Sequence, residues 1–310
     1  MNIVKDMLKA GKTAVGASAY LDSPVGLLAD AGFDFLLFDT QHSTMGIKEL
    51  EHALQAMRGK KAIPVIRVGD NYQDQICYAL DIGAKGIIVP MVNSKEEAAH
   101  MVGCCKYPPD GIRSAAGMRG EWGEFKDYTE YMSAVNEELL IIPMVETSKA
   151  LKNLDEIVST PGIDVLLVGP SDLSIALGIA LDYHNPKYQG TLDKIAEACI
   201  DAGVVPGMYF LPGGLDPSDF VERGFRFFTR PWNQWATTGI QNGLATIKII
   251  RMDYPLLPCI LLASAAEQVV LSKALELEVF SGIGKPVDMG VLRGQLNRLF
   301  IKRYNCDIFK

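Results

Sequence analysis

The chain has 310 residues, of which 48% are hydrophobic and 22% are charged, and its formal net charge at pH 7 is -7. This composition is typical of a globular chain that is long enough to bury a large core. The acidic balance provides no basic surface, so neither nucleic acid nor an anionic membrane is expected as a partner. The sequence has no apolar run of membrane-spanning length and no signal-peptide core at its start, which predicts a cytoplasmic protein.

The six cysteines form no CxxC pair, and none has a histidine at the spacing of a metal site. In a chain expected in the cytoplasm, this pattern argues against both a zinc site and a disulfide framework. We therefore expect the cysteines to be free thiols, mostly buried.

Short apolar runs recur about every 20 to 40 residues between residues 12 and 230 and alternate with amphipathic stretches. Runs that are apolar on both faces are typical of parallel strands covered by helices. Eight strands are predicted, at residues 13–20, 33–39, 62–68, 85–92, 139–145, 163–169, 205–211 and 225–230.

The stretches between these runs have helical patterning, and several end in glycine just before the next strand, as helix C-terminal caps do. Helices are predicted at residues 47–59, 74–84, 94–106, 151–160, 191–203, 216–224 and 234–248. Eight strand–helix units in about 250 residues predict a (β/α)8 TIM barrel over residues 1–247. An open doubly wound sheet is the alternative, but no GxGxxG sequence follows the first strand to support a dinucleotide fold.

Two regions depart from the alternation. The segment from Tyr107 to about Asn136 is long and rich in glycine and proline, so it forms either a wall or lid of an active site or an ordered surface excursion. Residues 248–310 begin with the apolar IIRMDYPLLPCILL and continue with helix-like stretches at 265–280 and 291–304. We expect a helical C-terminal extension that packs on the barrel or on a neighbouring subunit.

Residues of complementary chemistry follow four of the predicted strands. Asp39 and His42 follow the second strand, Arg67 ends the third, Glu146 follows the fifth and Asp172 follows the sixth. Barrel enzymes hold their active sites at the C-terminal ends of the strands. Because Glu146 and Asp172 are one strand–helix unit apart, their carboxylates can converge. Two such oxygen ligands, completed by substrate and water, suit Mg²⁺ or Mn²⁺.

Each of these residues also has an ordinary structural explanation. Asp172 can cap a helix, Glu146 can favour the positive end of a helix dipole, and an arginine at a strand end often forms a surface ion pair. A histidine in the position of His42 is more often structural than catalytic. Their coincidence at one end of a barrel is the argument for an active site.

Six segments together resemble the HpcH/HpaI aldolase family, the class II metal-dependent 2-oxo acid aldolases of the phosphoenolpyruvate/pyruvate barrel superfamily. They are FDTQHS, PVIRV, ALDIGAKGIIVPMV, YPPDGIRS, IIPMVETSKALKNLDEI and DVLLVGPSDLSIALG, in the family's order. The resemblance implies a barrel that forms or cleaves the bond between pyruvate and an aldehyde, acting on 4-hydroxy-2-oxo acids. It also implies a homo-oligomer, a hexamer or trimer, with a terminal helix packed on a neighbour.

The resemblance implies a role for each residue at a strand end. Glu146 and Asp172 bind a divalent cation, Mg²⁺, Mn²⁺ or Co²⁺, which takes up charge of the pyruvate enolate. Arg67 contacts the 2-oxo oxygen and adds a fixed positive charge. Asp39 and His42 act as a dyad that moves the proton of the 4-hydroxyl through a water.

Ser171 and Asp172 are implied to donate backbone N–H groups to the pyruvate carboxylate at the start of a helix. Two positions depart from the family pattern. Gln41 stands where most members have glutamate before the histidine, which changes the charge around the bound water. Met144 stands where the family has glutamine two residues before the metal-binding glutamate, so the pocket lacks that polar neighbour.

The aldehyde partner is not indicated by these motifs. Contacts from the long loop and from Arg119, Trp122, Arg230 and Trp232 are possible, although each of these side chains also has a packing or surface-pairing explanation. The same site also fits an oxaloacetate decarboxylase or a malyl- or citryl-type lyase, because all of these reactions pass through an enolate. A weakly active barrel that only binds 2-oxo acids is the third interpretation.

Overall fold

The computed structural model describes residues 1–118, 120–234, 260–264 and 281–285, together with residues 294, 296 and 298. The chain divides into two compact units, Met1–Trp232 and Asn233–Lys310. Each unit is described by itself.

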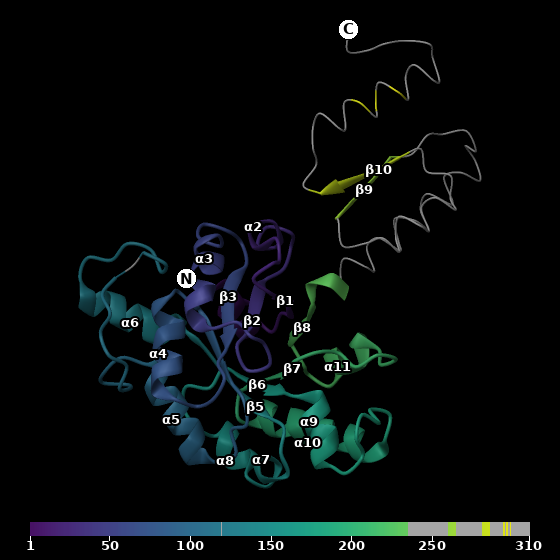
Figure 1. Ribbon diagram of the computed structural model, residues 1–310. Helices are drawn as coiled ribbons and strands as arrows, with labels where there is room; N and C mark the ends of the chain where they lie inside the picture. Colours follow the sequence, from purple (N-terminus) through teal and green to yellow (C-terminus); the bar gives the residue numbers. More distant parts are fainter. Residues whose placement is uncertain are drawn as a thin grey trace. The chain divides into compact units, whose positions relative to one another are not determined.

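Eight parallel strands close into a barrel in the order of the sequence, with β8 hydrogen-bonded to β1 (Figure 1). They are β1 Ala14–Ala19, β2 Phe35–Asp39, β3 Ile63–Arg67, β4 Gly86–Val89, β5 Leu140–Val145, β6 Val165–Val168, β7 Val205–Met208 and β8 Phe227–Pro231. Each strand coincides with one of the eight predicted runs. The (β/α)8 barrel is therefore confirmed, and the open sheet is excluded.

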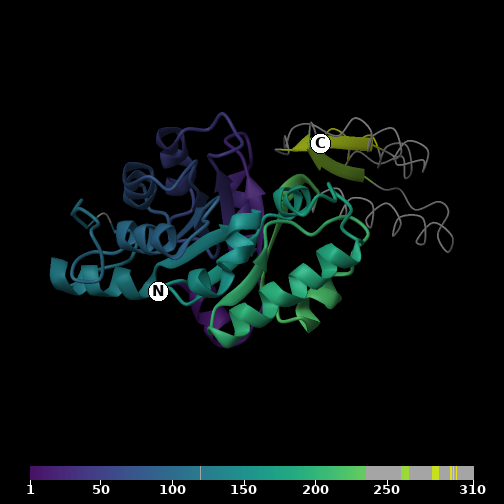
Figure 2. The same ribbon diagram turned by 90° about the horizontal axis from the view of Figure 1, so that it is seen from below.

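Helices lie around the outside of the strands, apart from α1 at one end of the barrel, as the two views of the barrel unit show (Figures 1 and 2). They are α1 Ile3–Lys9, α2 Val25–Leu28, α3 Ile47–Gln55, α4 Gln73–Asp81, α5 Lys95–Cys105, α6 Tyr128–Glu138, α7 Ser148–Lys152, α8 Leu154–Val158, α9 Pro170–Ala176, α10 Pro186–Asp201 and α11 Pro217–Glu222. None of the helices in the described part of the chain combines the length and the apolarity needed to cross a membrane.

The single helix predicted over residues 151–160 is in fact two short helices, α7 and α8. Asn153 ends the first and begins the second, with φ -105° and ψ 17°. Its side-chain amide donates a 2.7 Å hydrogen bond to the carbonyl of Asn93. This bond ties Asn153 to the loop after β4, and asparagine is a poor residue for the interior of a helix, which explains the break at this position. The helix predicted at residues 234–248 lies outside the described residues, apart from Gln234.

The barrel interior has its own apolar core, built from alternate residues of the strands. The Phe35 and Phe227 rings stack there with centroids 4.3 Å apart. Gly16 makes this possible, because a Cβ atom at that position would lie 2.3 Å from the Phe35 ring. Val4 and Leu8 of α1 belong to the same core, so α1 closes the barrel at the N-terminal ends of the strands.

The opposite faces of the strands pack on the surrounding helices and form a second, larger core. Cys104, Cys105 and Cys199 are buried there, and Cys77 is partly buried. The thiols of Cys104, Cys105 and Cys199 are free, as the sequence predicts for them.

The described residues of the second unit contain a parallel strand pair, β9 Ile260–Ser264 and β10 Ser281–Lys285. This pair was not predicted. The predicted helix at 265–280 lies outside the described residues, and so does the predicted domain boundary at 247. Within the predicted helix at 291–304, the described residues Gly294, Leu296 and Arg298 are helical.

Candidate active site

Along each strand, every second side chain points into the barrel. This alternation continues to the C-terminal ends of the strands, where it determines which side chains lie in the site. Phe35 and Leu37 of β2 face the barrel core, so Asp39 follows them on the same face. The same count by two leads from Val65 to Arg67 on β3 and from Met144 to Glu146 after β5. Three of the predicted site residues thus reach the mouth of the barrel.

Asp39 and Arg67 are opposite each other in the β2–β3 ladder. The guanidinium binds the carboxylate at two points, from Nε to Oδ1 at 2.8 Å and from Nη2 to Oδ2 at 2.5 Å. The Asp39 side chain is only 13% exposed and the Arg67 side chain only 5%. Burial alone raises the pKa of Asp39, but the hydrogen bond and charge of Arg67 outweigh it, so the pKa is lowered. This buried pair stays ionised at neutral pH.

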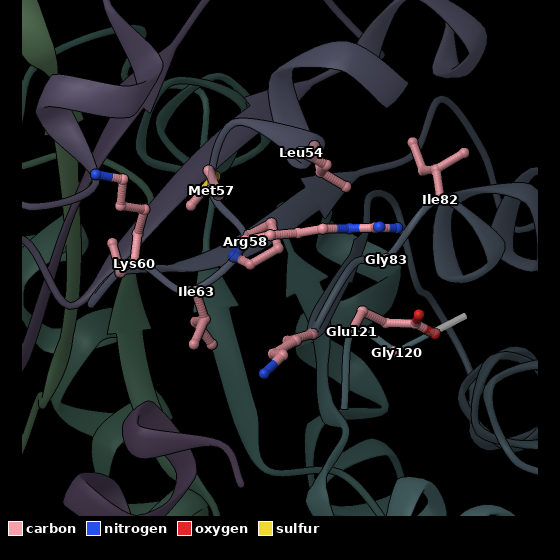
Figure 3. A pocket seen from close by; sticks show the side chains of 13 residues that line it. Leu54, Met57, Arg58, Lys60, Ile63, Ile82, Gly83, Gly120 and Glu121 are labelled. Atoms are coloured by element: carbon pink, nitrogen blue, oxygen red, sulfur yellow. The ribbon is translucent and has the colours of Figure 1, made fainter. Parts of the chain in front are cut away.

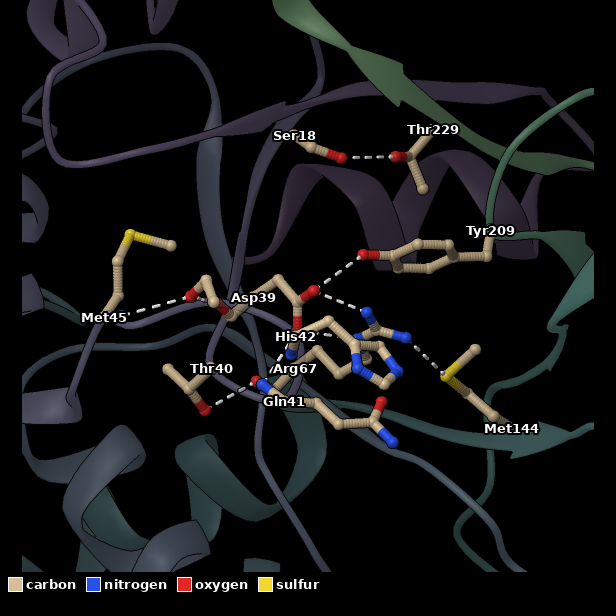
Figure 4. A network of polar contacts seen from close by, with 11 residues as sticks. Ser18, Asp39, Thr40, Gln41, His42, Met45, Arg67, Met144, Tyr209 and Thr229 are labelled. Atoms are coloured by element: carbon tan, nitrogen blue, oxygen red, sulfur yellow. Dashed lines mark hydrogen bonds and ion pairs between the residues drawn. The ribbon is translucent and has the colours of Figure 1, made fainter. Parts of the chain in front are cut away.

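Two further side chains complete the surroundings of Arg67 (Figure 4). The Tyr209 ring lies 4.1 Å from the guanidinium carbon, and its hydroxyl donates to Asp39 Oδ2 at 3.4 Å. The remaining guanidinium nitrogen, Nη1, lies 3.9 Å from the Met144 sulfur. Sequence reasoning missed Tyr209, although counting by two from Val205 places it on the inward face.

The turn after β2 carries His42 and Gln41. Asp39 Oδ1 accepts the backbone N–H of Gln41 at 2.9 Å and that of His42 at 3.4 Å. In the described part of the chain, no hydrogen bond joins the Asp39 carboxylate to the His42 imidazole, which is exposed. Asp39 therefore shapes the turn that holds His42 and directs its own side chain to Arg67. The predicted action of the two residues as a dyad stays a prediction.

Glu146 is 2% exposed and lies at the C-terminal end of β5. Its Oε1 accepts the backbone N–H of Met91 at 2.9 Å, and Met91 has φ 53°, an unfavourable conformation outside glycine. Gly169, at the end of β6, leaves room for the other oxygen: a Cβ atom there would lie 2.2 Å from Glu146 Oε2. Burial and the nearby charge of Asp172 raise the pKa of Glu146, while the Met91 N–H and Arg67 lower it.

Ser171 and Asp172 occupy the first turn of α9, which begins directly after β6. The first N–H groups of a helix have no intrahelical partner and favour anions. The Ser171 hydroxyl lies 3.3 Å from the Tyr183 hydroxyl, which fixes its side chain. Asp172 therefore follows β6, the neighbour of the strand that ends before Glu146, and its charge contributes to the raised pKa of Glu146.

The two carboxylates fit a divalent cation. No group of three or more histidine, cysteine, aspartate or glutamate side chains in the described part of the chain could hold a metal by itself. Glu146 and Asp172 instead form a two-carboxylate set whose mutual repulsion a cation relieves. Such a set suits Mg²⁺, Mn²⁺ or Co²⁺ when substrate oxygens and waters complete the ligands.

The long segment after α5 lies at the other end of the barrel. Trp122 is buried, and the Lys85 ammonium lies 5.0 Å from the centre of its ring, just before β4 begins. Gly120 and Glu121 line a cavity of about 120 Å³ beside the starts of β3 and β4 (Figure 3). Of the two interpretations of this segment, the structure therefore supports the surface excursion. Trp122 lies at the N-terminal end of its own barrel, away from the strand ends that carry the predicted site, and Arg119 lies outside the described residues.

The barrel and its site define a class: a (β/α)8 enzyme with a carboxylate pair, a buried arginine and a histidine at the C-terminal ends of its strands. Residues 22–230 match the HpcH/HpaI aldolase/citrate lyase family. The chain is 34% identical over 212 residues to a 4-hydroxy-2-oxo-heptane-1,7-dioate aldolase of Shigella sonnei, covering 67% of this chain and 80% of the relative.

Solved structures agree with the sequence relatives. An HpcH/HpaI aldolase/citrate lyase family protein from Burkholderia cenocepacia has a TM-score of 0.71 and 28% identity, covering 80% of this chain and all of the other. An HpcH/HpaI aldolase from Desulfitobacterium hafniense has a TM-score of 0.69 and 29% identity, covering 79% and 96%. The chain belongs to the HpcH/HpaI aldolase/citrate lyase family. The predicted activity class, a carbon–carbon lyase, is confirmed.

Proposed function

We propose that this protein is a metal-dependent aldolase that cleaves 4-hydroxy-2-oxo acids into pyruvate and an aldehyde and joins them in reverse. The observation that carries the proposal is the burial of Arg67 and Glu146 at the C-terminal ends of β3 and β5, where the inward alternation of both strands directs them into the mouth of the barrel. Cleavage leaves negative charge on the pyruvate enolate, and a fixed cation beside a metal-binding carboxylate pair is suited to stabilise it.

The 2-oxo acid end of the substrate has a carboxylate and a 2-oxo oxygen to be recognised. Arg67 uses Nε and Nη2 for Asp39, which leaves Nη1, beside the weakly accepting Met144 sulfur, to donate to the 2-oxo oxygen. Ser171 and Asp172 N–H groups receive the carboxylate. Glu146 and Asp172 hold the cation. When bound, the cation supplies a Lewis acid that stabilises the developing negative charge.

Proton transfer at the 4-hydroxyl is assigned to His42. It is exposed on the turn after β2, at the same end of the barrel as the buried Arg67 and Glu146, so it can reach substrate from the solvent side. Gln41 Oε1 is buried and has no hydrogen-bond donor among the described residues. This acceptor is suited to orient a water or the substrate hydroxyl beside the imidazole.

The aldehyde contacts that the sequence offers at Arg230 and Trp232 are not part of this proposal. Arg230 pairs in register with Ala17 of β1, whose side chain belongs to the outer core, and Trp232 packs on the same outer core. Relatives named 4-hydroxy-2-oxo-heptane-1,7-dioate aldolase act on a dicarboxylate, so aldehydes that carry a second carboxylate belong among the substrates to be tested.

A test begins with pyruvate alone. We expect the protein to exchange the methyl protons of pyruvate for deuterium in the presence of Mg²⁺, Mn²⁺ or Co²⁺, to lose this activity after chelation and to regain it with metal. A panel of aldehydes with pyruvate, and of hydroxy-oxo acids in the cleavage direction, then identifies the partner. Exchange that survives exhaustive chelation contradicts the metal assignment, and absence of exchange contradicts the aldolase.

Oxaloacetate decarboxylation and citryl- or malyl-type cleavage are the alternative reactions of the same site, because each leads to an enolate that Arg67 can stabilise. Product analysis with oxaloacetate against hydroxy-oxo acids separates them. We also propose a cytoplasmic homo-oligomer, a trimer or hexamer. A monomer in light scattering at all protein concentrations contradicts this assembly.

A further inference from the structure

We infer that Tyr209 is a positioning residue of the active site, which holds the Arg67–Asp39 pair in the orientation that turns one edge of the guanidinium toward substrate. The inference rests on the proposed function and adds Tyr209 to the residues that support it.

The guanidinium of Arg67 makes contacts in three places: along the edge formed by Nε and Nη2, over the plane of the group, and at the third nitrogen, Nη1. Asp39 binds the edge through Nε and Nη2. The Tyr209 ring covers the plane at 4.1 Å, a cation–π contact. Only Nη1 is left to a weak partner, the Met144 sulfur at 3.9 Å. Rotation of the guanidinium about its own axis would break the first two contacts, so together they fix the direction of Nη1 (Figure 4).

Tyr209 also binds the other half of the pair. Its hydroxyl donates to Asp39 Oδ2 at 3.4 Å, the oxygen that accepts Arg67 Nη2. Burial and the Asp39 charge raise the pKa of Tyr209, while the Arg67 charge lowers it, and the net shift is upward, so the phenol is a neutral donor at neutral pH. A single side chain thus contacts both members of a buried ion pair.

The tyrosine is itself anchored to the strand that leads to the metal-binding aspartate. Its backbone N–H donates to the Val168 carbonyl at the end of β6 at 3.0 Å. Gly169 and α9, with Ser171 and Asp172, follow Val168 directly. Through this contact the position of Arg67 is tied to that of the carboxylate pair. Catalytic groups held by rigid elements and locked neighbours keep their geometry better than groups on loops.

The experiment compares Tyr209→Phe, which keeps the ring and loses the hydroxyl, with Tyr209→Leu, which loses both. Phe210→Leu is the matched control, because it removes a neighbouring aromatic ring of the same segment while the cation–π contact to Arg67 and the hydrogen bond to Asp39, both made by Tyr209, remain. The first readout is the solvent exchange of the Arg67 Nε–H proton, followed by NMR with ¹⁵N-labelled arginine and assigned with Arg67→Lys. The second is kcat and KM for oxaloacetate decarboxylation with saturating Mn²⁺.

We expect Tyr209→Leu to accelerate the exchange about 2- to 30-fold and to lower kcat by a similar factor, on the scale of a lost cation–π contact. Tyr209→Phe shows a smaller change, and Phe210→Leu changes neither readout. In an Arg67→Lys background, which lacks the planar fork, Tyr209→Leu costs less kcat than in the wild type.

Unchanged exchange in Tyr209→Leu overturns the inference, and so does a loss of kcat that is equal in both Arg67 backgrounds. If the wild-type protein shows slow, Tyr209-dependent exchange but no enolate chemistry with pyruvate or oxaloacetate, the positioning role stands and the proposed function fails. The two failures are therefore distinguishable.

Discussion

The two ends of the barrel both carry charged side chains, but they use them differently. At the C-terminal end, Asp39, Arg67 and Glu146 are largely buried and interact across strands that are distant in the sequence. At the N-terminal end, Lys60 pairs with Asp30 at 2.7 Å on the surface, in the neighbourhood of the cavity of Figure 3. Buried pairs lie at this end too, Lys5 with Asp164 at 2.9 Å and Arg113 with Asp81 at 3.1 Å, and they join helices and loops of the scaffold.

Buried charges cost free energy unless they are paired and hydrogen-bonded, and at both ends the buried cations are paired with carboxylates. What distinguishes the C-terminal end is a pair of carboxylates, Glu146 and Asp172, whose like charges contribute to the raised pKa of Glu146. Catalysis is therefore assigned to the C-terminal end and structural support to the N-terminal end, the usual division in this fold.

The largest effects are expected at the C-terminal end, from His42→Ala and Arg67→Ala. Loss of a general base lowers aldol cleavage about 10²- to 10⁴-fold in His42→Ala. Decarboxylation of oxaloacetate produces the enolate without removing a hydroxyl proton, so His42→Ala spares it. Arg67→Ala lowers both reactions about 10²- to 10³-fold, on the scale of a lost oxyanion donor. The measurement is kcat/KM of both variants in both reactions at saturating metal.

Thermal unfolding and metal titration of both variants serve as controls, since Arg67→Ala leaves Asp39 buried without its partner. If His42→Ala loses decarboxylation as completely as cleavage while fold and metal binding persist, His42 is not a base for the 4-hydroxyl. Its assignment would then pass to another group near Gln41.

A smaller effect is expected from Gly169→Ala, which tests whether close packing around Glu146 matters. The new Cβ would lie 2.2 Å from Glu146 Oε2 and 3.1 Å from its Cδ, so the carboxylate must move. We expect the Mn²⁺ needed for half-maximal activity to rise about 10- to 100-fold, as for disturbed supports of metal ligands. An unchanged metal titration would show that Glu146 is free to adapt.

Gly190→Ala is the matched control for Gly169→Ala, because a Cβ at Gly190 meets no atom within 4 Å. Gly190 lies within α10, where alanine is favoured over glycine by about 0.5–1 kcal/mol. The free energy of unfolding should therefore rise, with metal dependence and kcat unchanged. Lower stability would mean that the neighbours of α10 do not accommodate the methyl group.

Most of the barrel was predictable because its signal is local. Apolar runs with helical stretches between them locate all eight strands. Counting every second residue along a strand then shows which residues at its end point into the barrel. Tyr209 follows the same count, yet an aromatic residue at the end of the run VPGMYFL has the composition of ordinary core. What identifies its role is contact with Arg67 from a strand more than a hundred residues away, and such contacts depend on barrel closure.

The pairing of Asp39 and the place of the long segment show two other limits. The register that sets Asp39 opposite Arg67 is a relation between strands, so the sequence of either strand does not contain it. The segment after residue 106 follows a helix of 11 residues, which carries the chain about 16 Å back toward the N-terminal end. Its place could have been predicted from that order, but its glycines and prolines suggested an active-site loop.

The smallest effect is expected from Lys85→Met at the N-terminal end. Burial lowers the pKa of Lys85, with Glu121 and Glu138 opposing, so the folded state disfavours its charge. Methionine removes that cost, keeps apolar contact with Trp122 and gives up a cation–π contact of about 0.5–1 kcal/mol. These terms oppose each other, and the free energy of unfolding in urea should change by less than about 1 kcal/mol.

The pH dependence follows from the lowered pKa of Lys85 in the folded state. The cost of burying the charged ammonium is fully present below the folded-state pKa and disappears as pH rises through the unfolded-state pKa, so the stability of the variant should exceed that of the wild type most at the lower pH. Decarboxylation should keep its wild-type kcat/KM to within about twofold, since Lys85 lies at the opposite end of its strand from the site. A tenfold loss of kcat/KM in a stably folded Lys85→Met protein would break the comparison, because the cavity at the N-terminal end would then influence the chemistry across the length of the barrel.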